Sequence, residues 1–267
     1  MKVNNFVIDR IIRGIMTSTA TGEYMWSINQ ITDPSLNITS ETAEAVDALG
    51  SRIAVFNRGK SAEFTANNSL FDLGLFAAQN GVKVQDASVN SVTAPIFDEI
   101  TVVSGTSVYA LTKVPVDGGS EFTAIYGVNG DGTLGEKFTK SSTSSVSDTT
   151  FAYNATDHEI TIPTNLTYKK LMAIYDYTET AATYVTGDAV NFPKAGKFVM
   201  EVLGADVCDP TTLIHAYLVF PNAKLDANVD ISFTTDGNHP FTIQCQQSYC
   251  DNEKILYQLI IPEVATN

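Results

Sequence analysis

The most constraining feature of this chain is the short, regular spacing of its apolar runs. Segments rich in Thr, Val, Ile and aromatic residues alternate with polar positions, and Gly, Pro, Asn or Asp interrupts them about every ten residues. This pattern is typical of strands joined by turns. The chain has 267 residues and is 44% hydrophobic, so it is long enough to bury substantial cores. We therefore expect an all-β fold, a β-sandwich or barrel, with one short flanking helix.

The segment from Val46 to Gly81 has the strongest local pattern. Apolar residues alternate in Arg52 to Phe56 and again in Ser61 to Thr65. Asn57-Arg58-Gly59-Lys60 stands between them and has turn chemistry, so a hairpin is predicted here. A helical turn is expected just upstream, around Glu41 to Ala48.

A helix is predicted over Ser69 to Gln79. Asn67 or Asn68 offers an N-cap and Asn80-Gly81 offers a stop. Its apolar residues spread around the axis, whereas a surface helix keeps one polar face. Two interpretations stay open: a central helix inside a single core, or a helix held between its own sheet and a neighbouring subunit.

The remaining pattern suggests three parts. Residues 1–81 and 196–267 are expected to build one β domain together, and residues 82–195 to form an inserted or elaborated β unit. Five strands are predicted in the last part: Lys197 to Leu203, Leu213 to Phe220, Val229 to Thr234, Phe241 to Ser248 and Ile255 to Ile261.

Charge and cysteine content exclude several classes of protein. The formal net charge is -14, which argues against a protein that grips nucleic acid by neutralising phosphates. An acidic wall would instead let DNA pass without sticking, although acidity also serves solubility alone. Asp9, Arg10 and Arg13 interrupt the apolar run that an export signal needs, and no run has transmembrane length. Three cysteines without paired spacing suggest a reducing cytoplasm.

The sequence predicts no catalytic, cofactor-binding or metal-binding residues. Its three histidines are isolated, and no nucleophile signature accompanies them. The glycine-rich stretch Asn129 to Glu136 lacks the spacing of a calcium loop, so a hairpin turn is favoured. Arg52, Arg58 and Lys60 form a basic cluster in an acidic chain. It is either a solvated face or a contact with an acidic surface of the next copy.

Two regions resemble the major tail tube proteins of long-tailed bacteriophages. The first runs from Val46-Asp47-Ala48-Leu49-Gly50 through the predicted hairpin to Asn68-Ser69-Leu70-Phe71-Asp72-Leu73, which opens the helix. The second includes Val219 to Leu225 and the last strand, Leu256 to Ile261. The resemblance covers about half the chain, residues 24–81 and 196–262. The middle part resembles nothing specific, but an extra immunoglobulin-like β unit is common in such proteins.

This resemblance implies a virion structural protein without enzymatic activity or cofactor. Its copies would form rings, hexameric in this family, that stack into a hollow tail tube for DNA delivery. Its partners would be further copies, other tail proteins and passing viral DNA, with no membrane. Assembly in the bacterial host cytoplasm would place it in the virion tail. The candidate assembly residues are Arg52, Arg58, Lys60, Leu70, Phe71, Leu73, Leu75 and Phe76.

Other functions remain open from the sequence. A capsid decoration or other head protein would have the same composition but no channel. A surface adhesin or carbohydrate-binding module would expose an aromatic cluster on its loops, which Tyr24 and Trp26 alone do not make. A hydrolase would bring a histidine to a Ser or Cys in the fold.

Overall fold

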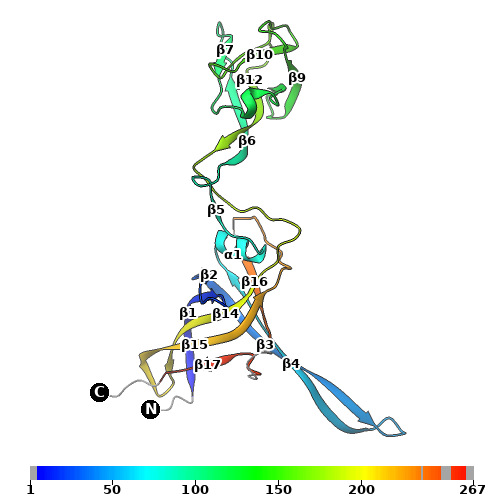
Figure 1. Cartoon of the computed structure of the whole chain (residues 1–267), viewed down its shortest axis with the longest axis vertical. Coiled ribbons are helices and arrows are strands. Elements are labelled where there is room, and N and C mark those ends of the chain that lie inside the picture. Colours follow the sequence, from blue (N-terminus) through cyan, green and yellow to red (C-terminus); the bar gives the residue numbers. More distant parts are fainter. Residues whose placement is uncertain (1–4, 236, 248–253, 263–267) are drawn as a thin grey trace. The chain divides into compact units, whose positions relative to one another are not determined.

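The chain folds into two compact units, which are described separately here. In this computed structural model the structure describes residues 5–235, 237–247 and 254–262. Unit 1 combines the residues up to Val84 with those from Val185 onward, and unit 2 is Gln85–Tyr184 (Figure 1). Strands dominate both units, and among the described residues α1 (Leu73–Gln79) is the one α-helix. The predicted all-β fold is confirmed.

Unit 1 is built on one antiparallel sheet of eight strands. Their order is β2-β1-β14-β15-β16-β4-β3, and β17 pairs with β15 beside β16. Strands from the two ends of the sequence therefore share a sheet, since β1 lies against β14. The strands are β1 (Phe6–Thr17), β2 (Tyr24–Ile28), β3 (Ile31–Val46), β4 (Arg52–Asn68), β14 (Ala195–Asp206), β15 (Asp209–Leu225), β16 (His239–Cys245) and β17 (Gln258–Ile260).

The core of unit 1 is an aromatic cluster on one face of this sheet. Alternation along β14 buries Phe198, Met200 and Val202 on that face. The Phe198 ring stacks on Trp26 with centroids 5.4 Å apart and lies 6.3 Å from Phe64. The aromatic packing therefore joins β2, β4 and β14 to a common core.

The helix α1 is shorter than predicted. Strand β4 continues to Asn68, so neither Asn67 nor Asn68 caps the helix, and that prediction was wrong. Asp72 is the N-cap instead, and its carboxylate accepts the backbone N–H of Leu75 at 2.7 Å. The predicted stop is confirmed. Gly81 has a φ of +71°, and a Cβ there would come within 2.4 Å of the Phe192 backbone.

The hairpin predicted at Asn57 to Lys60 was wrong, because these residues lie inside the unbroken strand β4. Ser40 pairs with Lys60 and Glu41 with Arg58, so Gly59 is the extra residue of a β-bulge. The helical turn expected at Glu41 to Ala48 was also wrong, because β3 continues to Val46.

The real hairpin turn joins β3 and β4 at Asp47 to Ser51. The Asp47 carboxylate accepts the backbone N–H groups of Leu49 and Ser51, at 2.9 and 2.8 Å. Gly50 takes a φ of +83°. A carboxylate that folds back onto the backbone and a glycine in the left-handed region together make this a tight turn.

Unit 2 has a sheet of seven strands in the order β6-β12-β8-β9-β10-β11-β7, and a separate pair, β5 and β13. Its own core includes Phe122, Ile125, Phe151 and Leu171. Asn129 to Thr133 form the turn between β8 and β9, as predicted. The elements are β5 (Gln85–Asp86), β6 (Val92–Thr101), β7 (Val108–Ala110), the 3-10 helix η1 (Val116–Gly119), β8 (Ala124–Val128), β9 (Leu134–Lys140), β10 (Thr150–Asn154), β11 (Glu159–Thr161), β12 (Lys170–Glu179) and β13 (Thr183–Tyr184).

One strand predicted near the C-terminus is absent. Val229 to Thr234 forms no strand and lies in the loop between β15 and β16. Parts of the predicted strands Phe241 to Ser248 and Ile255 to Ile261 are seen as β16 and β17, while residues 248–253 lie outside the described residues. That residues 1–81 and 196–267 form a tube domain around an immunoglobulin-like insert stays a prediction.

Candidate assembly surface

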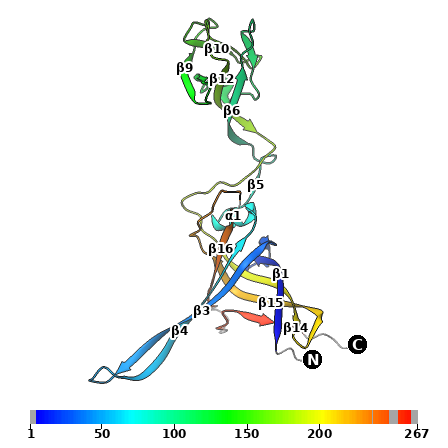
Figure 2. The ribbon, with the colours of Figure 1, turned by 180° about the vertical axis from the view of Figure 1, so that it is seen from behind.

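A long exposed element of unit 1 is the distal part of the β3–β4 hairpin, residues 39–61, which we call the arm. Strand β4 pairs with β16 only from Glu63 onward, so in the arm β3 and β4 pair with each other alone. No residue of the arm is buried. Figure 2 shows it extending away from the rest of the sheet. A two-stranded ribbon with solvent on both faces is only marginally stable by itself.

The arm carries apolar side chains toward its tip. Leu49 in the turn is 92% exposed, Ile53 is 68% exposed and Phe56 is 58% exposed. Val46 and Val55 are exposed beside them. Scattered exposed apolar residues are ordinary, but several together on one unsupported ribbon make it a candidate interaction surface.

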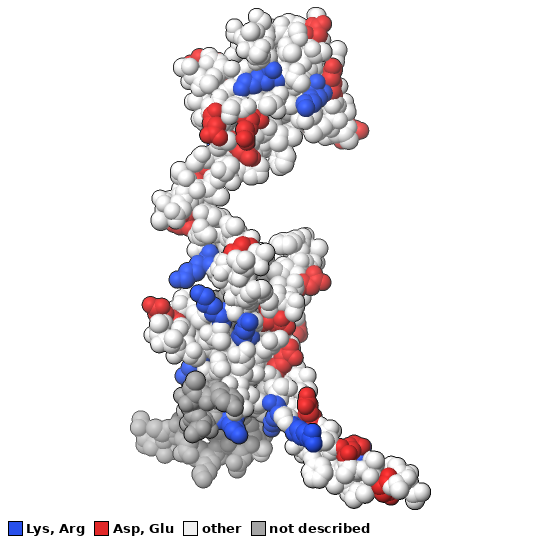
Figure 3. All heavy atoms as spheres, turned by 45° about the vertical axis from the view of Figure 1, so that its right-hand side comes forward, with Lys and Arg blue, Asp and Glu red and all other residues white. Residues whose placement is uncertain are grey.

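The three basic residues predicted for assembly all lie on the β4 side of the arm. Arg52 forms an ion pair with Glu44 on β3. Arg58 is the cross-strand partner of Glu41, and Lys60 pairs across from Ser40. Both signs of charge are visible along the arm in Figure 3. The cluster is therefore partly matched by acids of the same chain, on the strand beside it.

The five apolar residues predicted for assembly lie at the opposite end of β4, at α1. Leu75 is fully buried in the core of unit 1, so its side chain is not available to a partner. Leu70 is 62% exposed and Phe71 48% exposed. Leu73 and Phe76 are half-buried. The structure thus divides the predicted residues between two surfaces instead of gathering them on one.

An aromatic residue that the sequence did not single out completes the surface at α1. Phe233, in the loop before β16, is 80% exposed, and its ring centroid lies 5.7 Å from that of Phe71. Phe71 also packs against Phe76 at 5.6 Å. We call Leu70, Phe71, Phe76 and Phe233 the α1 patch. The sequence analysis assigned Val229 to Thr234 to a strand, which would have placed Phe233 in a sheet. Phe233 was therefore not considered as a surface residue.

A buried histidine holds α1 to the sheet beneath the patch. His239 is fully buried and stacks on the Phe71 ring. Its Nδ1 accepts the backbone N–H of Asp72 at 3.2 Å, so Nε2 carries the proton and donates to Gln79 Oε1 at 2.8 Å. Gln79 in turn donates to the Pro240 carbonyl at 2.9 Å. This network uses the neutral ring.

We predict that acid destabilises unit 1 through His239. Burial lowers the pKa of His239 below its usual value, although the nearby Asp72 opposes this. The unfolded chain therefore binds the proton first. The stability that the neutral ring provides is complete above about pH 6.5 and is lost as pH falls through the lowered pKa. Urea unfolding at pH 7.5 and 5 should show a larger loss for the wild type than for His239→Gln. Equal losses in both proteins would contradict this role.

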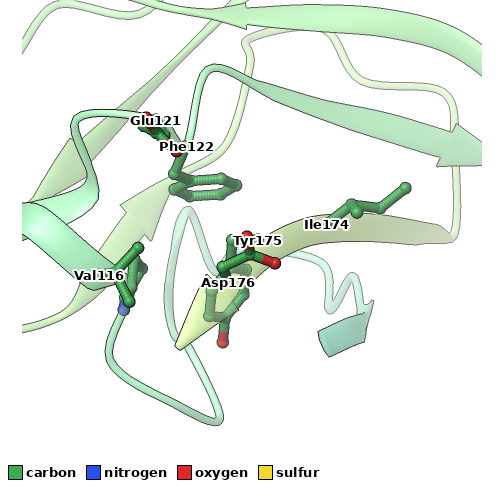
Figure 4. Close-up of a pocket in the computed structure, with 7 residues that line it drawn as sticks. Val116, Glu121, Phe122, Ile174, Tyr175 and Asp176 are labelled. Carbon is green, nitrogen blue, oxygen red and sulfur yellow. The ribbon is translucent and has the colours of Figure 1, made fainter. Parts of the chain in front are cut away.

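Two hollows in the described part of unit 2 hold no recognisable catalytic arrangement. One in unit 2 has a volume of about 170 Å³ and is walled by Phe122 and Tyr175 (Figure 4). The Tyr175 hydroxyl donates to Asp98 at 2.9 Å, and the lining has no histidine or cysteine. Across the described residues, no three His, Cys, Asp or Glu side chains are grouped to hold a metal ion. Nor does any helix in the described part of the chain have the length and apolar character to cross a membrane.

Two described side chains outside these hollows have surroundings that do not favour a catalytic base or nucleophile. His215 lies on the sheet surface, with Nδ1 2.7 Å from Glu201. Burial raises the pKa of the Cys245 thiol to about 11, which keeps it protonated and inert. Cys208 is exposed and free.

These features describe an all-β protein with a long exposed ribbon and an exposed apolar patch at α1. The chain belongs to the YomU/Tube protein family, whose family model matches residues 6–257. Membership in this family indicates a phage tube-like structural protein. A search of curated proteins finds no match.

Proposed function

We propose that this protein is the subunit of a phage tail tube, in which copies associate into stacked rings around a channel for DNA. The arm is the observation that carries the proposal. It is a long ribbon with exposed apolar residues on a chain that belongs to a tube family. Association would bury this ribbon and supply the packing that it lacks within one copy.

The edges of the sheet support association between copies. The eight-stranded sheet ends in β2 on one side and β3 on the other. The arm has further outer edges, because β16 pairs with β4 only from Glu63 onward. Pairing of strand edges between neighbouring copies, closed into a ring, would remove the free edges.

The acidic composition fits a channel that conducts DNA without holding it. With a formal net charge of -14, the assembled subunits repel phosphates at moderate ionic strength. The tube would therefore let a duplex slide through it. Electron microscopy of the purified protein tests the arrangement directly. Stacked rings with an open bore are expected, whereas rings without a bore would favour a head protein, and monomers at every concentration would contradict assembly.

Shortening the arm should abolish association without unfolding the protein. Residues 42–57 are replaced by Asn-Gly, which joins the cross-strand partners Glu41 and Arg58 through a two-residue turn. No deleted residue is buried, so the core that includes Phe198 and Trp26 stays intact. Sedimentation velocity should then show a folded monomer at concentrations where the wild type assembles.

A matched control alters charge but keeps the ribbon. Arg10→Ala lies on β1 outside the arm, where the side chain is exposed and its ion-pair partner is the adjacent Asp9. This variant should assemble like the wild type. Assembly of the shortened protein with an unchanged concentration dependence would rule out the arm as the association element.

A further inference from the structure

The chain contains the dipeptide Asn-Gly twice, at Asn80-Gly81 and at Asn129-Gly130, and the fold gives the two copies different surroundings. Asparagine followed by glycine readily loses its side-chain amide, because glycine has no Cβ to keep its backbone nitrogen away from the asparagine Cγ. The reaction needs a free glycine N–H and a backbone that can move into a five-membered ring. Hydrogen bonds to the reacting groups, or tight packing around them, therefore slow it.

The first copy, at the end of α1, is held in place. The Asn80 side-chain amide donates to the Phe76 carbonyl at 2.8 Å, and the Gly81 N–H donates to the Ala78 carbonyl at 3.1 Å. Gly81 also lies so close to the Phe192 backbone that a Cβ would not fit there. Ring formation would break both hydrogen bonds and move a closely packed segment, so this site must open locally before it reacts.

The second copy lies in the turn between β8 and β9. Asn129 and Gly130 are both exposed, and a Cβ on Gly130 would meet no atom within 4 Å. Within the described chain, the Gly130 N–H has no backbone acceptor. The Asn129 side-chain amide donates one hydrogen bond, of 3.0 Å, to the Thr133 hydroxyl. A single solvent-exposed bond of this kind contributes little, so both reacting groups are accessible.

We propose that Asn129-Gly130 is a site of spontaneous deamidation in the folded protein, and that the fold protects Asn80-Gly81. The Gly130 nitrogen loses its proton to a solvent base and bonds to Asn129 Cγ. The Cγ–Nδ2 bond breaks as Nδ2 takes up a proton and leaves as ammonia. Water then opens the cyclic imide. Attack at the side-chain carbonyl gives aspartate, and attack at the backbone carbonyl gives isoaspartate.

Either product changes the turn. A carboxylate at this position cannot donate to the Thr133 hydroxyl, whose own proton goes to the Asp131 carboxylate at 2.6 Å. Isoaspartate also adds one carbon to the main chain, which displaces the backbone hydrogen bonds that Asn129 makes with Thr133 and Gly132. The modification therefore adds a negative charge to unit 2 and loosens the β8–β9 hairpin.

Peptide mapping of folded and unfolded protein tests the inference. The purified protein is held at pH 8 in buffer and, separately, in guanidinium chloride. Each digest is then analysed by mass spectrometry and by isoaspartate methyltransferase labelling. In guanidinium chloride the two sites should react at rates within about threefold of each other, because the contacts of Asn80 are lost. In buffer, Asn129 should convert at least about tenfold faster than Asn80, since only Asn80 requires local opening.

Asn129→Gln is the matched control. It keeps a side-chain amide but would need a larger ring to react, so the product at this position should disappear while the slow conversion at Asn80 is unchanged.

Two results would overturn the inference. An Asn129 that stays unmodified in buffer, while the unfolded chain reacts, would show that the turn protects it as well. Equal conversion of both sites in buffer would show that the contacts of Asn80 give no protection. Neither result depends on self-association, so both would leave the tail-tube proposal standing.

Discussion

Replacing Phe198 with alanine is expected to lower the free energy of unfolding of unit 1 by about 3–5 kcal/mol. The ring is fully buried and contacts the aromatic rings of Trp26, Phe64 and Phe220, at centroid distances of 5.4, 6.3 and 6.0 Å. These neighbours come from β2, β4 and β15, which are held by their own ladders. The cavity left by the ring therefore cannot collapse easily, and most of the lost packing stays lost.

Gly14 supplies a sharper version of this experiment. A Cβ on Gly14 would lie 2.6 Å from the Phe198 ring, so Gly14→Ala alone should destabilise the wild type by about 1–3 kcal/mol through overpacking. In the Phe198→Ala background the same methyl group enters the cavity and should cost little or stabilise. The two substitutions should therefore be strongly non-additive. Additive effects would show that the two residues do not share this space.

The measurement is simple because the chain has a single tryptophan. Trp26 lies 2% exposed in the core of unit 1, so its fluorescence reports the urea unfolding of that unit. Phe192→Ala is the control, since its side chain is 63% exposed and should change stability by no more than about 0.5 kcal/mol. A Phe198→Ala protein as stable as this control would contradict the described core.

The sequence predicted the fold class because strand alternation is a strictly local signal. Along β14, Phe198, Met200 and Val202 are buried while Lys197 is exposed, a period of two that needs no knowledge of the partner strand. The end of the helix at Gly81 was equally predictable, since a glycine after a helical run commonly takes a positive φ. Both features follow from residues close together in the chain.

Pairing between distant residues explains the errors. Asn57-Arg58-Gly59-Lys60 has the composition of a turn, but the β3 ladder holds it as strand and places Gly59 in a bulge. The Glu- and Ala-rich end of β3 has helical propensity, which the same ladder overrides. The helix begins late for a related reason. Pairing of β4 with β16 keeps Asn67 and Asn68 in the sheet.

The candidate surface was predictable only in part. The basic residues could be noticed as a local group because they are close in sequence, and their role in assembly stays a prediction. That Leu70 and Phe71 are exposed while Leu75 is buried depends on how α1 lies on the sheet, and no periodicity fixes that orientation in a helix of seven residues. Phe233 joins Phe71 across more than 160 positions of sequence, a contact that only the fold reveals.

Replacing Asp98 with alanine should destabilise unit 2 by about 3 kcal/mol. Asp98 is buried on β6, and its carboxylate accepts three hydrogen bonds. Two come from the backbone N–H and the hydroxyl of Thr112, each at 2.7 Å, and the third comes from the Tyr175 hydroxyl at 2.9 Å. Alanine leaves all three donors without this acceptor. The carboxylate thus joins β6, β12 and the segment after β7. The free energy of unfolding falls because buried donors lose this acceptor.

A double-mutant cycle with Tyr175→Phe isolates one of these donors. Burial raises the pKa of Tyr175, with a smaller contribution from Asp98, so the hydroxyl stays protonated and donates. Without Asp98 the Tyr175 hydroxyl keeps only the Lys113 carbonyl, at 3.0 Å, as an acceptor. Removing the hydroxyl first should therefore reduce the cost of Asp98→Ala by the contribution of its bond to the carboxylate. Far-UV circular dichroism records the strands of both units, so the unfolding of unit 2 is the part of its transition that moves in the variant. Trp26 fluorescence should not shift, since Trp26 belongs to the core of unit 1. Asp176→Ala, an exposed carboxylate on β12, is the matched control. An Asp98→Ala protein no less stable than this control would show that the carboxylate is not the acceptor that the geometry indicates.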